Sequence, residues 1–167
     1  MPSSLRKIQS RARLVRRTQE LRREGKPLVF TNGCFDLLHP GHVTLLERAK
    51  RLGAVLVVAI NSDRSVRRLK GPQRPILPQR VRAALVAALA SVDYVTIFDE
   101  PTPYRLIAAI APDVLVKGSD WQAGRIVGER LVTKRGGRVV RVPLVGGYST
   151  TRLINRILRQ ERRPRPG

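Results

Sequence analysis

Short apolar runs rich in β-branched residues alternate along this chain with segments whose apolar residues recur at helical spacing. A helix pattern follows each of the expected strands, which lie at 28–32, 54–61, 94–98, 113–118 and 138–144. This alternation predicts an α/β fold, a Rossmann-like parallel sheet flanked by helices on both faces. The run AVLVVAIN at 54–61 is almost continuously apolar, as expected for a strand covered on both faces.

The helix patterns and the charge divide the chain into three parts. Helices are expected at 5–23, 41–53, 81–92, 103–111, 125–135 and 150–160. The segment 62–78 is polar, basic and interrupted by prolines, which predicts a long loop. We therefore expect a basic N-terminal helix (1–26), one α/β domain (27–158) and a basic tail (159–167).

The two ends of the chain carry much of its charge. The sequence has 33 Lys and Arg against 12 Asp and Glu, a net charge of +21. Residues 1–26 contain nine basic and two acidic residues, and residues 152–167 contain six and one. Clustered cations suit phosphate neutralisation, so a nucleic-acid-binding module using the Arg-rich ends is one hypothesis. The alternative is a coding bias that enriches Arg, Ala, Gly and Pro together, because no aromatic residues are interleaved with these charges.

Several classes of protein are excluded by what the sequence lacks. No apolar run is long enough to cross a membrane, and the first residues have no secretory h-region, so we expect a cytoplasmic protein with no membrane partner. The single cysteine, Cys34, excludes a disulfide framework and a cysteine-based zinc site.

The strongest motif is TNGCFDLLHPGH at 31–42, which ends the first strand and opens the next helix. Backbone N–H groups at a helix N-terminus favour an anion, and His39 and His42 would add donors aimed at the same anion. Gly41 leaves the backbone bare, so a phosphate can approach closely. No third metal ligand is apparent beside the histidines, and we expect no metal held by the protein here.

Polar residues follow the predicted strands at 31–36, 61–63, 99–100 and 117–120. Because the carboxyl ends of parallel strands share one edge of the sheet, these clusters are expected to converge there.

The segment GCFDLLHPGH has the HxGH signature of the cytidylyltransferase-like nucleotidyltransferases. With RLKGPQRPI at 68–76, PDVLVKGSDW at 112–121 and GYSTT at 147–151, the chain most resembles the adenylyltransferases of ADP-heptose synthesis. The resemblance extends from about residue 28 to residue 158. It implies transfer of AMP from ATP to a sugar 1-phosphate, D-glycero-β-D-manno-heptose 1-phosphate, with release of pyrophosphate. It also implies Mg²⁺ bound mainly through the nucleotide phosphates, and a homodimer.

Residue chemistry and this resemblance together predict the site. His39, His42 and Lys70 are the expected catalytic residues, since nucleotidyl transfer needs positioning and charge neutralisation rather than a covalent nucleophile. The residues expected to bind nucleotide are Thr31, Asn32, Gly33, Cys34, Phe35, His39, Gly41, His42, Arg82, Lys117, Gly118, Asp120, Tyr148, Ser149, Thr150 and Thr151. The residues expected to bind the acceptor substrate are Asp36, Asn61, Asp63, Lys70, Arg74 and Trp121.

Several of these assignments have alternatives. Asp36 is expected to accept substrate hydroxyls, although it could simply cap the helix start. Ser149 could be a plain N-cap, and Trp121 could stack on a base or fill the edge of the core. Relatives of the resembled family often have Glu-Arg where this chain has Val81-Arg82, so the carboxylate partner of Arg82 is in question.

The competing enzyme hypothesis is a glycerol-3-phosphate-type cytidylyltransferase that uses CTP. That family has closely similar GCFDLLHPGH, GSDW and YSTT segments. The segments at 68–76 and 102–118 resemble the heptose branch more.

Overall fold

The computed structural model describes residues 2–119, 122, 124–143 and 146–161. Five parallel strands form one sheet in the order β3-β2-β1-β4-β5. The strands are β1 (Leu28–Gly33), β2 (Val55–Asn61), β3 (Tyr94–Phe98), β4 (Val114–Gly118) and β5 (Arg138–Val142). The helices are η1 (Ser3–Lys7), α1 (Arg11–Arg23), α2 (Pro40–Lys50), α3 (Asp63–Lys70), α4 (Gln79–Ala88), α5 (Tyr104–Ile110), α6 (Glu129–Thr133) and α7 (Thr150–Glu161). The α/β class predicted from the alternation is confirmed.

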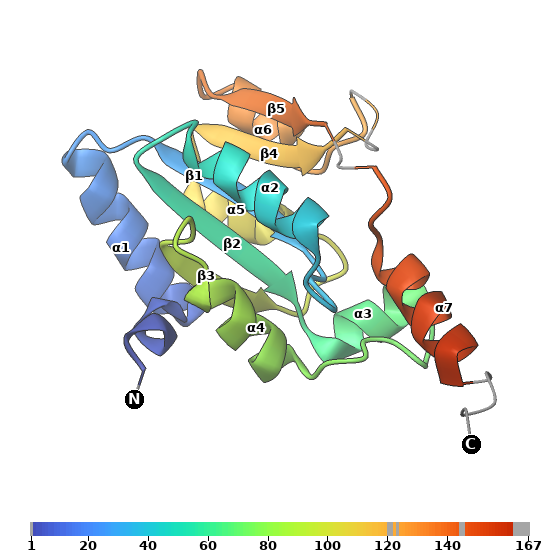
Figure 1. Cartoon of the computed structure of the whole chain (residues 1–167). Helices are drawn as coiled ribbons and strands as arrows, with labels where there is room; N and C mark the ends of the chain where they lie inside the picture. Colours follow the sequence, from blue (N-terminus) through green and yellow to red (C-terminus); the bar gives the residue numbers. More distant parts are fainter. Residues whose placement is uncertain (1, 120–121, 123, 144–145, 162–167) are drawn as a thin grey trace.

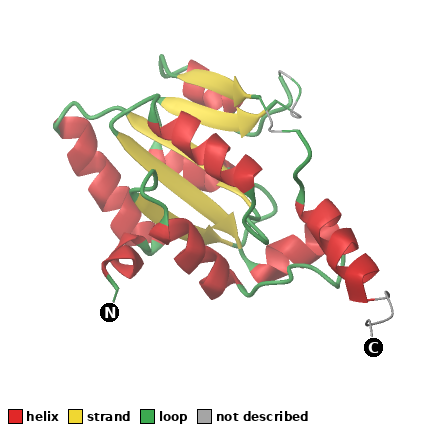
Figure 2. Ribbon diagram, viewed as in Figure 1, coloured by secondary structure: helices red, strands yellow, loops and turns green. Residues whose placement is uncertain are grey.

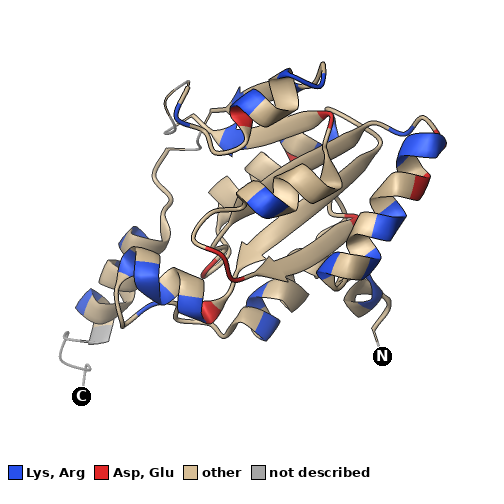
Figure 3. Ribbon diagram, turned by 180° about the vertical axis from the view of Figure 1, so that it is seen from behind, with Lys and Arg blue, Asp and Glu red and all other residues tan. Residues whose placement is uncertain are grey.

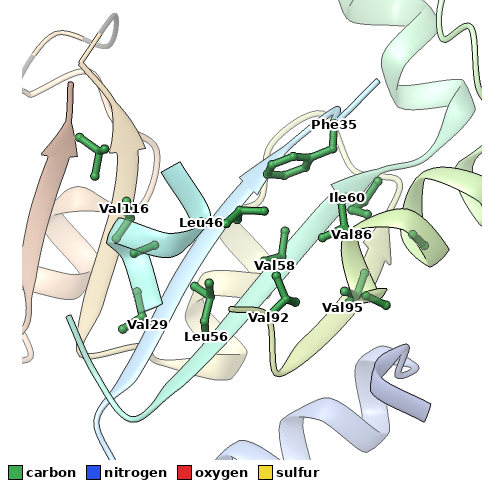
Figure 4. Packing of buried hydrophobic residues seen from close by; sticks show 14 of the residues in the cluster. Val29, Phe35, Leu46, Leu56, Val58, Ile60, Val86, Val92, Val95 and Val116 are labelled. Carbon is green, nitrogen blue, oxygen red and sulfur yellow. The ribbon is translucent and has the colours of Figure 1, made fainter. Parts of the chain in front are cut away.

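Helices cover both faces of this sheet (Figures 1 and 2). On one face, α2 and α4 pack on alternate residues of the central strands, including Val29, Val58 and Val116 (Figure 4). On the other face, α1, α5 and α6 pack on the intervening residues, such as Phe30 and Val57. All residues of β2 are buried, which explains its uninterrupted apolar sequence.

Helix α1 is an integral part of this core. Leu14, Thr18 and Leu21 are buried at helical spacing, and the two leucines belong to the cluster behind the sheet. The arginines of α1 have local structural partners: Arg11 pairs with Glu100 at 2.6 Å, and Arg22 donates to the carbonyls of Ile110 and Ala111. The basic N-terminal segment is therefore fastened to the α/β body.

Some element boundaries differ from the sequence expectations. The helix expected at 5–23 is interrupted, because Ile8 forms a parallel bridge with Val95 and the N–H of Gln9 donates to the Val95 carbonyl. The loop expected at 62–78 is wrong in its first half, where α3 begins after Ser62, whose hydroxyl accepts from the Ser65 N–H at 3.0 Å. The helix expected at 125–135 is shorter, spanning only α6.

The ends of the molecule differ in how they are attached. The described part of the C-terminal segment ends in α7, which lies away from the sheet (Figure 1). Lys and Arg residues are frequent on α1, α3 and α7 (Figure 3). No helix among the described residues has the length and hydrophobicity needed to span a bilayer.

Candidate active site

The described polar residues that follow the strands lie along the carboxyl edge of the sheet, and the strand order reverses between β1 and β4. β1 pairs with β2 on one side and with β4 on the other. The strands β2 and β3 are therefore added on one side of β1, and β4 and β5 on the other. Lys117, near the end of β4, donates to the side-chain oxygen of Asn32 in β1 at 2.6 Å. Ligands of open α/β sheets bind at the carboxyl ends of the strands beside such a reversal.

The turn from β1 into α2 has a constrained backbone. Phe35 and Leu37 both have positive φ, 49° and 52°, although neither is glycine. Backbone strain of this kind persists where the surrounding structure fixes it, and it is frequent at functional sites. His39 then takes the N-cap position with extended backbone, and Pro40 occupies the first turn of α2, where its fixed φ suits a helix start.

The two histidines of the HPGH segment lie against each other. The imidazoles of His39 and His42 stack with ring centroids 3.8 Å apart and planes 22° apart. A Cβ at Gly41 would lie 3.0 Å from Cε1 and Nδ1 of His39, so a side chain at position 41 would push this ring away. The absence of a side chain at position 41 therefore allows the His39 ring to fold over the helix start.

Burial favours the neutral form of both imidazoles. Burial lowers the pKa of His39. Burial also lowers the pKa of His42 to about 4, with the charges of His39 and Lys70 acting in the same direction. The Nδ1 atoms of both rings are buried and have no hydrogen-bond partner within the described residues. A neutral imidazole has one donor and one acceptor nitrogen, so each ring can donate to a phosphate oxygen.

The helix start offers fewer free backbone donors than the motif suggested. Pro40 has no N–H, and the N–H groups of His42 and Val43 both donate to the His39 carbonyl. An anion at this helix start would therefore rely mainly on the histidine side chains.

The side chain of Arg82 connects the carboxyl ends of β1 and β2. Its side chain is 0% exposed, and its guanidinium donates to the carbonyls of Cys34 and Asn61 and to the Asp63 carboxylate at 2.8 Å. Its Nε also donates to Leu77 at 2.9 Å. Asp63 is thus the carboxylate partner that the sequence left in question. These contacts differ from the expectation that Arg82 holds nucleotide phosphates, because burial keeps its guanidinium from a ligand.

Asp36 is also buried and bonded to protein. Its carboxylate accepts from Nε of Arg74 and from the backbone N–H groups of Ile76 and Leu77, at distances from 2.9 to 3.0 Å. Burial acts to raise the pKa of Asp36, but these hydrogen bonds outweigh it and the pKa is lowered. The expected role in accepting substrate hydroxyls differs from this arrangement, in which protein donors surround the carboxylate.

The start of α7 reaches the same region. The Thr150 hydroxyl donates to the backbone carbonyl of Asp36 at 2.7 Å, and the Ser149 hydroxyl caps α7 by accepting from the Arg152 N–H. Thr151 and Tyr148 are exposed. Of the three consecutive hydroxyls, Ser149 and Thr150 therefore already have structural partners.

Comparison with known proteins identifies the family of this site. The cytidylyltransferase-like family model matches residues 30–156. The chain belongs to the cytidylyltransferase-like family. Among its relatives is the bifunctional protein HldE of Syntrophotalea carbinolica, 56% identical over 82% of this chain and 28% of that protein. HldE of Gluconobacter oxydans is 52% identical over 88% of this chain and 30% of that protein. The chain thus spans about 30% of the length of these relatives.

Solved structures agree with this family assignment. A lipopolysaccharide core biosynthesis protein from Thermoplasma volcanium aligns with a TM-score of 0.60 and 30% identity, covering 72% of this chain and 98% of its own. A pantoate-β-alanine ligase from Francisella tularensis aligns with a TM-score of 0.57 at 16% identity, covering 94% of this chain and 79% of its own. The second likeness shows the fold alone.

The remaining predicted residues of this cytidylyltransferase-like site lie around the same edge. Thr31 is buried, and its hydroxyl has no hydrogen-bond partner in the described part of the chain. The Asn61 amide donates to the Ser65 hydroxyl at 3.0 Å. Lys70 is exposed at the end of α3, and Gly118 ends β4. Asp120 and Trp121 lie outside the described residues.

Sequence reasoning missed the residues that act through their backbones. Ile76 and Leu77 contribute only N–H and carbonyl groups to this network. Gln79 was also missed, and its side-chain oxygen accepts from the Asp63 N–H. The pattern of prolines at 75 and 78 was the available signal, because it indicates a segment with a fixed path.

Cavities and metal ligands add little to the assignment. An apolar groove of about 690 Å³ lies between η1 and α4, and none of its lining residues belongs to the predicted site. Within the described residues, no group of three His, Cys, Asp or Glu side chains could hold a metal ion.

Proposed function

We propose that this chain transfers AMP from ATP to D-glycero-β-D-manno-heptose 1-phosphate, giving ADP-heptose and pyrophosphate. The observation that carries the proposal is the stacked pair His39 and His42 at the strand reversal, in a chain of the cytidylyltransferase-like family. Identities of 52–56% with bifunctional HldE proteins over more than four-fifths of this chain support the heptose branch.

The reaction is an in-line displacement at the α-phosphorus of ATP. An oxygen of the acceptor phosphate forms the new P–O bond, while the bond to the β-phosphate breaks and pyrophosphate leaves with the electron pair. The acceptor is already ionised, so no strong general base is needed. His39 and His42 would donate hydrogen bonds to phosphate oxygens as charge grows on them, and Lys70 would add a positive charge.

A bound Mg²⁺ would neutralise phosphate charge, and we propose that it comes with the nucleotide. The described residues give it no dedicated carboxylate cage. The homodimer and the cytoplasmic location expected from the sequence stay predictions.

Pyrophosphate release tests the proposal directly. Purified protein is incubated with ATP or CTP, each with heptose 1-phosphate or glycerol 3-phosphate, and His42→Ala serves as the inactive control. We expect ATP with heptose 1-phosphate to be the best pair. Glycerol 3-phosphate should be poorer by orders of magnitude in kcat/KM, because a site built for several hydroxyls leaves polar groups unpaired with a smaller acceptor. Faster turnover of CTP with glycerol 3-phosphate would establish the cytidylyltransferase alternative instead.

A further inference from the structure

Asp36 connects three segments that are far apart in the sequence. Its carboxylate accepts from the segment after α3, through Arg74 Nε at 3.0 Å, Ile76 N at 2.9 Å and Leu77 N at 3.0 Å. Its backbone carbonyl accepts from Thr150 at the start of α7. Asp36 itself stands in the turn that leads to the histidines. One residue thus connects the HPGH turn, the segment 71–78 and α7.

The carboxylate of Asp36 is enclosed by protein groups. The side chain of Asp36 is 0% exposed, and that of Arg74 is 14% exposed. A carboxylate has about four acceptor positions, and protein donors already occupy three of them in this structure. A substrate hydroxyl could reach this carboxylate only after displacing the segment 74–77.

The segment 71–78 makes few other contacts that fix its position. Lys70, Pro72 and Gln73 are exposed, and a Cβ on Gly71 would have no neighbour within 4 Å. Beyond Asp36, the Leu77 carbonyl is held by Arg82 at the far end of the segment. The contacts to Asp36 therefore decide where Arg74, and the segment that follows Lys70, lie relative to the histidines.

We propose that Asp36 is a positioning residue for nucleotidyl transfer, which sets the segment 71–78 and the start of α7 against the histidine pair and does not bind the acceptor sugar. This inference rests on the proposed function for its kinetic consequences. The hydrogen bonds from Arg74, Ile76 and Leu77 to the Asp36 carboxylate, called the clamp below, are independent of the substrate. Small displacements of groups that neutralise charge can cost about a hundredfold in rate, so loss of the clamp should act on kcat.

The test compares Asp36→Asn with Asp93→Asn as a matched control. Asp93 is another carboxylate that accepts from a backbone N–H, that of Leu56 at 2.7 Å, and from Lys50, but at the opposite end of the sheet. We expect Asp36→Asn to lower kcat about tenfold to hundredfold while KM for the acceptor changes less than about threefold. Asp93→Asn should lower the melting temperature and leave kcat unchanged.

Amide hydrogen exchange measured by NMR examines the clamp without any substrate. In the wild-type protein the N–H groups of Ile76 and Leu77 should exchange more slowly than that of exposed Gln73. Asp36→Asn should reduce this difference, because the amide keeps only one of the two acceptor oxygens. The kcat of the double variant Asp36→Asn/Arg74→Gln should be no lower than that of Asp36→Asn alone, because both substitutions break the same contact. Should Asp36→Asn not fold, Arg74→Gln tests the same contact from its other side.

Two results would overturn the proposal. One is an increase in KM for the acceptor with kcat unchanged, as expected if Asp36 binds the sugar. The other is unprotected Ile76 and Leu77 amides in the wild-type protein. An inactive wild-type protein would instead reject the proposed function, while the exchange experiment would still decide the clamp.

Discussion

The two ends of the parallel sheet are built differently. At the amino end, carboxylates bind the first backbone groups of the strands: Asp113 accepts from Leu28 at 2.7 Å, and Asp93 accepts from Leu56 and pairs with Lys50. At the carboxyl end, the buried Nδ1 atoms of His39 and His42 have no partner in the described part of the chain.

We infer from this difference that the amino end of the sheet mainly stabilises the fold, whereas the carboxyl end carries the chemistry. Buried polar groups are normally satisfied, so the unpartnered imidazole nitrogens need an explanation, and a bound phosphate would give one. The positive φ angles of Phe35 and Leu37 lie at this same carboxyl end. Substitutions at the amino end and behind the sheet should therefore lower stability, whereas substitutions at the carboxyl end should lower activity.

The largest effect is expected at the histidines. His39→Ala or His42→Ala should lower kcat by about a hundredfold or more, roughly 3 kcal/mol, because each removes a preorganised donor to a developing negative charge. KM for ATP should change much less. Steady-state pyrophosphate release with a thermal unfolding curve for each variant provides the measurement. A lower melting temperature with near-normal kcat for the folded fraction would remove these residues from the catalytic set.

The opposite result is expected for Leu14 in α1. Leu14 is 0% exposed, so Leu14→Ala should lower the free energy of unfolding by about 2–5 kcal/mol through lost burial and a new cavity. The kcat of the remaining folded protein should stay unchanged. Urea unfolding followed by circular dichroism measures this, and Arg16→Ala, on the exposed side of the same helix, serves as the control. A fall in kcat without a fall in stability would mean that α1 acts on the chemistry.

The stability of the folded protein should depend on pH through His42, at the carboxyl end of the sheet. Its pKa is about 4 in the folded protein, below the ordinary value of 6.5. Between these pH values the unfolded chain binds more protons at this residue, so stability should be lost as the pH falls from about 6.5 towards 4. The melting temperature of the wild-type protein and of His42→Ala, measured from pH 7 to pH 4, should diverge, with the variant losing less. Parallel curves would show that His42 titrates normally.

Features of the fold and the site could be predicted from the sequence where they depend on residues close together in the chain. Strands such as 94–98 and the histidine motif are local patterns, and both were predicted. The contacts of Arg82 are not local, because its partners Cys34, Asn61 and Asp63 come together only when the strands pair. The first half of the segment 62–78 was misread because its many charges hid the N-cap of Ser62, which starts a helix. The contacts of Asp36 were not predicted for a related reason: its donors are mainly backbone groups, which leave no trace in residue identity.

The smallest effect is expected at the C-terminal end of the chain. Ile157 and Leu158 of α7 are 50% and 48% exposed, and α7 joins the site through Thr150, which lies before them. Deleting residues 159–167 removes four basic residues and one acidic residue, Glu161, but keeps Thr150. Because charged ends are usually solvated, kcat should change by less than about twofold. KM for ATP should rise slightly at low salt and match the full chain at about 0.15 M salt, where distant charges are screened. A collapse of kcat with an unchanged melting temperature would show that the C-terminal end takes part in the transfer, and the division between a stabilising amino end and a chemical carboxyl end would then have to include it.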